Sequence, residues 1–480
     1  MPALRYVLAI ASERFPVGTA VATRLPPTLL DAAWARRLPG LLVMILLVSP
    51  PPLFAQQDTS GEHVRTSAQE AQATTKTPPS RRDSTTADPD ALILYTSDGS
   101  GKLRFESRDG DVNGRIGGRI MFDYTAGGID EAVEPETGPM EDGTEFRRVR
   151  LFTEGSLYDI GYKFQIGFAG DPDINDMYLE FPSPVPNSGI KVGKLKEDIS
   201  LAEMTSSKYI TFMARPLLTE FAGGRDLGVR LGGGAVGGDL NYGIGVYRAT
   251  VDDALGTSQG DGDYKGTGRV TYVPWSQDGN RKLIHVGASG SVASLDSGLS
   301  PDEQPEEAHE PEVHLAPDFV DTGPIDAERT TRFGFESALV YNSFSVQAEV
   351  LRKDYGLDTG GSDPTFGSWY VAGSYFLTGE HRPYDGGAFG RVQPVENFRA
   401  GANGGLGAWE IAARYSTMDL TDSGIVGGEV DTITLGVNWY LNPSVRIMAN
   451  YVLANVDDAV GTTDADGDGH FVTMRVQLDF

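Results

Sequence analysis

The feature that most constrains this fold is an alternation of apolar and polar residues that recurs along most of the chain. In YKFQIGF (162–168), Tyr162, Phe164 and Ile166 alternate with polar or small residues. The last ten residues, FVTMRVQLDF (471–480), repeat the pattern and end on Phe480. A period of two gives a strand one apolar and one polar face. The pattern therefore predicts β structure almost throughout.

Sixteen such segments can be placed, each about as long as a tilted strand that crosses a bilayer. They lie near residues 115–124, 145–157, 161–169, 174–181, 189–197, 225–232, 239–248, 264–274, 283–293, 330–340, 343–354, 367–377, 405–417, 430–441, 444–455 and 470–480. Short connections such as YDIG and LNPS alternate with long ones at 125–144, 198–224, 295–329 and 456–469. The connection 378–404 is long where the alternation requires a short one, so either a strand pair is miscounted or that turn is elaborated.

The sequence is predicted to form an all-β, transmembrane antiparallel β-barrel of about 16 strands. Outer-membrane barrels have short turns at one end and long loops at the other. A β-sandwich or propeller would instead need turns of uniform length and apolar faces that meet in a core. With 40% hydrophobic residues, a helical membrane protein of many spans is excluded, and the absence of Cys excludes thiol chemistry. The net charge of −27 excludes nucleic acid as a partner.

The N-terminal region has a different composition. Arg36 and Arg37 precede an apolar run over 38–48, and three prolines break the run before Ala55. This arrangement is typical of a signal peptide, predicted here over residues 1–55. Residues 56–91 have almost no large apolar side chains and are predicted to form a disordered periplasmic tether. The barrel is predicted to span residues 92–480.

Several stretches resemble the phosphate-selective porin O and P family. They include GGRIMFDY, EFRRVRLFTEGSLYDIGYKFQIGFAG, TSSKYITFMARPLLTEF and FLTGEHRPYDGGAFGRVQP. The resemblance covers most of residues 92–480. It implies a 16-stranded outer-membrane barrel, usually a homotrimer, that passes anions by diffusion. A loop that folds into the lumen would narrow the pore, and a ladder of arginines would guide the anion to it.

The resemblance also implies a site. The connection DISLAEMTSSKYITFMARPLLTEF (198–221) corresponds to the constriction loop, and the paired arginines of the second strand correspond to Arg147 and Arg148. The expected anion-binding residues are Arg147, Arg148, Ser206, Ser207, Lys208 and Arg215, with Lys194 and Lys196 at the root of the loop. The expected basic ladder of the lumen is Arg115, Arg119, Arg150, Arg230 and Arg414. About half of the lumenal charges are expected only to brace the wall.

One residue departs from the family pattern. Glu203 stands where phosphate-selective members carry a lysine, and a carboxylate there repels phosphate unless it pairs with Arg215 or Lys208. The acidic loops 128–145 and 301–319 also oppose anion entry. An unselective or cation-preferring porin therefore stays open as an alternative, as does a structural or adhesive barrel closed by its loops.

The remaining expectations concern location and partners. No catalytic motif, cofactor motif or metal-ligand spacing occurs, so the chain is not expected to be an enzyme or to bind a cofactor or metal. The expected location is the outer membrane of a Gram-negative-type bacterium. The expected partners are small anions, with phosphate suspected, the lipid bilayer, lipopolysaccharide, two further copies in a homotrimer and the barrel-assembly machinery. Ending on Phe480 matches the aromatic-terminated last strand that outer-membrane barrels present to that machinery.

Overall fold

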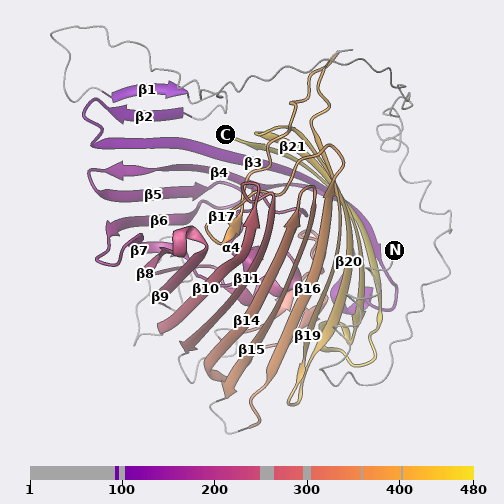
Figure 1. Cartoon of the computed structure of the whole chain (residues 1–480). Coiled ribbons are helices and arrows are strands. Elements are labelled where there is room, and N and C mark those ends of the chain that lie inside the picture. Colours follow the sequence, from indigo (N-terminus) through magenta and orange to yellow (C-terminus); the bar gives the residue numbers. More distant parts are fainter. Residues whose placement is uncertain (1–91, 97–102, 249–263, 296–303, 358–360, 402–403) are drawn as a thin grey trace. The chain divides into compact units, whose positions relative to one another are not determined.

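The computed structural model describes residues 92–480 except 97–102, 249–263, 296–303, 358–360 and 402–403. The signal peptide and the tether predicted for residues 1–91 lie outside these described residues. Sixteen antiparallel strands form a closed barrel, in which the last strand pairs with the first, β22 with β3 (Figure 1). The strands are β3 (Val112–Ile129), β4 (Gly143–Leu157), β5 (Ile160–Gly167), β6 (Asp173–Pro182), β7 (Ser188–Lys196), β8 (Arg225–Ala235), β9 (Leu240–Arg248), β10 (Tyr264–Gln277), β11 (Lys282–Ser294), β14 (Ala327–Tyr341), β15 (Phe344–Leu357), β16 (Thr365–Phe376), β19 (Ala408–Asp422), β20 (Ile425–Asn442), β21 (Val445–Asp457) and β22 (Gly467–Asp479). The predicted fold class and strand number are confirmed.

The alternation along the strands separates a polar inner face from an apolar outer face. On β22, Val476 and Leu478 are 51% and 40% exposed, whereas Arg475, which directly precedes Val476, is 2% exposed. On β14, Phe333 is 51% exposed beside the buried Arg332. Burial of charged residues and exposure of apolar ones is the reverse of a water-soluble protein. It is the arrangement that a lipid environment selects.

The connections follow the predicted alternation of short and long. The turn between β14 and β15 is residues 342–343, whereas the loop between β3 and β4 spans 130–142 and holds α3 (Glu134–Thr137). The number of barrel strands before and after this connection is the predicted one. The long connection after β16 therefore lies at the end of the barrel that carries the short turns. That turn is therefore elaborated, and no strand pair is miscounted. One loop is shorter than the alternation predicts, since β19 and β20 are joined by residues 423–424 alone.

Three connections contribute buried segments inside the barrel. The inner loop (197–224), which contains α4 (Leu201–Met204) and η2 (Leu217–Ala222), joins β7 to β8 at the long-loop end. The outer insert (304–326), with β12 (Ala308–His309) and β13 (Val320–Asp321), belongs to the connection between β11 and β14. The turn insert (377–407), with β17 (Tyr384–Asp385) and β18 (Ala388–Phe389), enters from the short-turn end. In the part of the chain that the structure describes, no helix is long and apolar enough to cross a membrane.

Side chains of the last four strands fix the inner loop. Arg446 donates to the carbonyl of Ile210 at 2.8 Å, and Arg475 donates to that of Met213 at 2.8 Å. The amides of Asn438 and Gln477 and the guanidinium of Arg414 reach three more carbonyls of residues 208–214. An extended segment has carbonyls that need donors when they are buried. Strands β19 to β22 supply these donors.

A short hairpin precedes the barrel. Strands β1 (Leu92–Thr96) and β2 (Leu103–Ser107) pair with each other, and β2 continues onto β3 by pairing residues 103–106 with 113–116. The closing strand β22 uses the same edge of β3 from Arg119 onward. The carbonyl of Phe480 accepts from the amide of Gly118 at 2.9 Å. The hairpin and the C-terminal strand therefore share one edge of β3.

Candidate functional site

A charged cavity of about 650 Å³ lies between the inner loop and strands β3 to β8. Its lining includes thirteen Lys or Arg side chains and eight Asp or Glu side chains, an excess of five positive charges. The basic residues are Arg115, Arg119, Arg147, Arg148, Arg150, Lys163, Lys191, Lys196, Lys208, Arg215, Arg225, Arg230 and Arg475. The acidic ones are Asp123, Glu145, Glu154, Asp176, Glu203, Glu220, Glu310 and Glu312. The sign is opposite to that of the whole chain, which carries −27.

Eight of the thirteen basic groups form ion pairs. Asp176 binds Arg225 at 2.7 Å and Lys163 at 3.2 Å, and Arg475 binds Asp123 at 2.6 Å. Within the described part of the chain, five basic groups have no carboxylate within 4.0 Å. These five are Arg119, Arg147, Arg148, Arg150 and Lys208. They are the groups that a mobile anion can neutralise.

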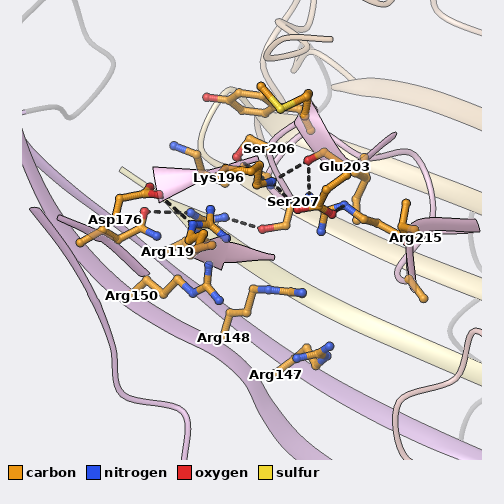
Figure 2. A pocket seen from close by; sticks show the side chains of 18 of the residues that line it. Arg119, Arg147, Arg148, Arg150, Asp176, Lys196, Glu203, Ser206, Ser207 and Arg215 are labelled. Atoms are coloured by element: carbon orange, nitrogen blue, oxygen red, sulfur yellow. Dashed lines mark hydrogen bonds and ion pairs between the residues drawn. The ribbon is translucent and has the colours of Figure 1, made fainter. Parts of the chain in front are cut away.

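A β-bulge in β4 allows three of the five unpaired basic residues to face the cavity from the same strand. In the pairing of β3 with β4, Met121 lies opposite Arg148 and Phe122 lies opposite Phe146, so Arg147 is an extra residue. Without the bulge, neighbouring residues would face opposite sides. With it, Arg147, Arg148 and Arg150 all line the cavity, while Phe146 stays outside at 58% exposure. Figure 2 shows the three side chains in a row facing the inner loop.

Two serines of the inner loop face the row of arginines. Ser207 accepts a hydrogen bond from the Arg119 guanidinium, which also donates to Gln165 at 3.1 Å. The Ser206 oxygen accepts from the backbone amide of Lys208 at 3.4 Å, so its own proton is available to the cavity. Guanidinium and hydroxyl groups are the donors that bind oxyanions in proteins. The loop and the strand thus offer donors from two sides (Figure 2).

Glu203 is neutralised within the inner loop. Its carboxylate binds Lys196 at 2.7 Å and Arg215 at 2.9 Å (Figure 2). Burial would raise the pKa of Glu203, but the charges of Arg215 and Lys196 lower the pKa below its ordinary value. Arg215 also donates to the carbonyls of Ala202 at 3.0 Å and Thr205 at 2.8 Å. Arg215 and Lys196 therefore hold the loop in shape, and both already contact the Glu203 carboxylate.

Lys208 is the one lysine among the five unpaired groups. Its ammonium lies over the rings of Phe152 and Tyr209, 5.2 and 5.4 Å from their centroids. Burial, together with the positive charge of Arg119, lowers the pKa of Lys208 to about 7. Its charge therefore depends on pH within the physiological range.

The cavity also contains acids that no lysine or arginine of the described chain neutralises. Glu145 pairs only with His314 of the outer insert, at 2.9 Å. Glu220 and Glu310 line the cavity without an ion pair to any described residue. The alternation could not identify the groups supplied by the outer insert, because a loop carries no periodic signal. Arg225, the first residue of the predicted strand segment 225–232, lines the cavity although it was not among the expected site residues.

Eleven of the thirteen residues expected at the site line the cavity. They are Arg115, Arg119, Arg147, Arg148, Arg150, Lys196, Ser206, Ser207, Lys208, Arg215 and Arg230. Lys194 lies opposite Met177 in the strand register and contacts Asp173 at 3.9 Å, away from the cavity lining. Arg414 lies behind the inner loop, where it binds Glu312 and the carbonyl of Ala214. Neither residue is placed to meet an anion in this cavity.

A closed barrel with an apolar outer wall and a charged cavity inside defines an outer-membrane channel protein. The sequence profile of the phosphate-selective porin O and P family matches residues 115–480, and the chain belongs to that family. Both the predicted family and the predicted location in the outer membrane of a Gram-negative bacterium are thereby confirmed.

The chain is also similar to individual proteins and solved structures. Porin O of Pseudomonas aeruginosa is 29% identical over 82% of this chain and 94% of its own length. An uncharacterized protein of Caulobacter vibrioides is 29% identical over 77% of this chain and 75% of its own length. Among solved structures, the outer membrane channel DcaP of Acinetobacter baumannii covers 78% of this chain and 99% of its own, with 12% identity and a TM-score of 0.47. OmpT of Vibrio cholerae covers 76% and 98%, with 10% identity and a TM-score of 0.47.

Proposed function

We propose that this porin is a passive diffusion channel that prefers small anions, with phosphate among them. The observation that carries the proposal is the group of five unpaired basic side chains in a cavity with a net positive lining. Charge of one sign in a narrow lumen raises the local concentration of the opposite ion. We assign the binding role to Arg119, Arg147, Arg148 and Arg150, with Ser206 and Ser207 as hydrogen-bond donors.

The pairing of Glu203 supports a place for phosphate in this channel. A free carboxylate would repel a dianion, but Lys196 and Arg215 both bind this one. Arg147, Arg148 and Arg150 supply rigid forks of N–H donors that match phosphate oxygens. Homotrimeric assembly and contact with lipopolysaccharide and the barrel-assembly machinery complete the proposal. The support for these three parts of the proposal is the family to which the chain belongs.

An unselective or cation-preferring channel is the second candidate. It is favoured by Glu220 and Glu310, which line the same cavity without a basic partner among the described residues. The two candidates differ in the sign of the ion that carries the current.

Single-channel recording in planar bilayers tests the proposal. In a potassium chloride gradient, the reversal potential is expected near the equilibrium potential of chloride, and added phosphate is expected to block the chloride current. Replacing Arg148 by Gln removes one charge-assisted contact, which is worth about 1.5–3 kcal/mol. We therefore expect phosphate block to weaken about tenfold or more.

Arg352→Gln is the matched control, because the Arg352 side chain is 62% exposed and pairs with Asp354 outside the cavity. It should leave reversal potential and block unchanged. A reversal potential near that of potassium would refute anion preference. Chloride preference without phosphate block would leave an anion channel and remove phosphate as a bound solute.

A further inference from the structure

A second, smaller cavity lies behind the inner loop, on the side away from the channel cavity. This back cavity is enclosed by residues 202–216 of the inner loop, strands β15, β16 and β19, and the turn insert, and its volume is about 40 Å³. Three of its lining residues are arginines, namely Arg215, Arg382 and Arg414. Among the described residues that line it, none is an aspartate or glutamate.

Arg382 is buried there with no carboxylate of the described chain in direct contact with it. Its residue is 8% exposed, and within the described chain no carboxylate lies within 4.0 Å of its guanidinium. One nitrogen donates to Gln347 at 2.8 Å, and the guanidinium stacks 3.6 Å from the centroid of the Phe389 ring. Its Nε–H is buried and has no hydrogen-bond partner among the described residues. An unpaired buried charge costs several kcal/mol, so a counter-ion in the adjacent space is favoured.

A second arginine borders the same space. Arg414 is 4% exposed and gives two nitrogens to the Ala214 carbonyl and to Glu312, so its charge is already paired. Ser345 and Ser374 share one hydrogen bond at 2.9 Å, so one of the two hydroxyl protons is left over. The back cavity thus combines the Arg382 guanidinium, which has a single hydrogen bond to the described residues, with one free hydroxyl proton.

We propose that the back cavity binds one monatomic halide ion, of the chloride class, as a structural ligand of the inner loop. A cavity needs about 10–15 Å³ to hold one water-sized particle, so the space suffices for a single halide. Part of the remaining lining is apolar, namely Ile210, Phe212 and Ala372, and the rest includes the uncharged polar residues Thr205, Thr211, Gln347 and Tyr370. A tetrahedral oxyanion needs donors around all of its oxygens, whereas a halide tolerates apolar contacts on one side.

The position of the halide gives it a structural consequence. Arg382 belongs to the turn insert, Arg414 to the wall and residues 202–216 to the inner loop. An anion between them joins elements that enter the barrel from its two ends. The halide would therefore hold the inner loop against the wall, and it does so independently of the ions that cross the channel.

Bromide is the probe that tests the proposal. Crystals of the intact protein grown in sodium bromide should show an anomalous scattering peak in the back cavity. Bromide at Arg147 and Arg148 serves as an internal reference for the channel site. Peaks at the channel arginines with ordinary water density in the back cavity would overturn the halide site and leave the proposed function standing.

Thermal unfolding of the detergent-solubilised protein provides a second readout. Replacing chloride by gluconate should lower the unfolding temperature by a few degrees, because a ligand of the folded state is removed. Arg382→Gln should abolish this chloride dependence, whereas Arg391→Gln, on the same insert but outside the back cavity, should keep it. An equal dependence on chloride in both variants would contradict the proposal, as would stabilisation by phosphate in place of halide.

Discussion

At the scale of single residues, the site is defined by which charges lack a partner. Thirteen basic side chains line the channel cavity, yet eight of them are engaged by carboxylates. Glu203 illustrates the effect, because Lys196 and Arg215 both bind its carboxylate, so the apparently repulsive group belongs to a cluster with no negative excess. The channel's selectivity is therefore expected to follow the few unpaired groups and to depend little on the total charge.

Lys208 gives a residue-scale prediction on pH. A lysine whose pKa lies at about 7 is charged below that pH and loses its charge as the pH rises through it. Preference for chloride, measured from the reversal potential, should therefore fall between pH 6 and pH 8.

Lys208→Arg is the control for this dependence, because a guanidinium stays charged throughout the range. The variant should show the same chloride preference at both pH values. If its preference falls as steeply as that of the parent protein, another group titrates and Lys208 is not responsible.

At the scale of elements, the bulge in β4 decides how many arginines face the channel. It adds one residue between Phe146 and Arg148, which reverses the alternation at that point. Phe146 before the bulge and Leu151 after it both face outward, so the outer face of β4 is apolar on both sides of the bulge. One irregularity therefore gives two adjacent arginines the same orientation.

Two deletions of equal length test the role of the bulge. Deleting one residue of the pair Arg147 and Arg148 should restore regular pairing between β3 and β4 and keep the apolar side chains on the outer face. The barrel should therefore fold, but its preference for anions should be weaker. Removing Val149 instead should turn one arginine toward lipid, at a cost of about 2–4 kcal/mol near the bilayer midplane. Heat-modifiable migration on gels reports folding, and equal assembly of the two deletions would contradict the bulge.

The strands were predictable from the sequence, but the details of the site were not. A period of two identifies strands and their faces, and sixteen segments located this way match the barrel. It cannot reveal the bulge, because Arg147 and Arg148 are the same residue type. A regular strand would turn one of the two inward whichever way the alternation runs, so the sequence does not show that both face the cavity. Nor can it show that Glu203 meets Lys196 and Arg215, since that contact depends on how the inner loop turns.

At the scale of the whole molecule, the two halves of the wall use their arginines differently. Strands β3 and β4 direct unpaired arginines at the cavity, whereas the arginines of β19, β21 and β22 hold the inner loop. Arg475 does this at the seam of the barrel. It binds Asp123 across the junction of the last and first strands and also the carbonyl of Met213.

The seam gives a prediction about stability. Arg475→Gln leaves Asp123 buried without its partner, which typically costs about 3–5 kcal/mol. The barrel should therefore unfold at a lower temperature, measured by circular dichroism in detergent. Adding Asp123→Asn should recover part of the loss, because no unpaired charge remains. If the double variant is less stable than Arg475→Gln alone, the buried carboxylate is not the source of the effect.

The hairpin before the barrel has a consequence for assembly. Strand β2 pairs with the edge of β3 up to Ile116, and the pairing of β22 with the same edge starts at Arg119. The two strands therefore leave no space for β22 to pair with β3 in a register shifted toward the hairpin. A closing strand that moved two residues toward the hairpin would collide with it. The hairpin can thus act as a stop that sets the stagger of the cylinder, and with the stagger its diameter, at the moment the ends of the sheet meet.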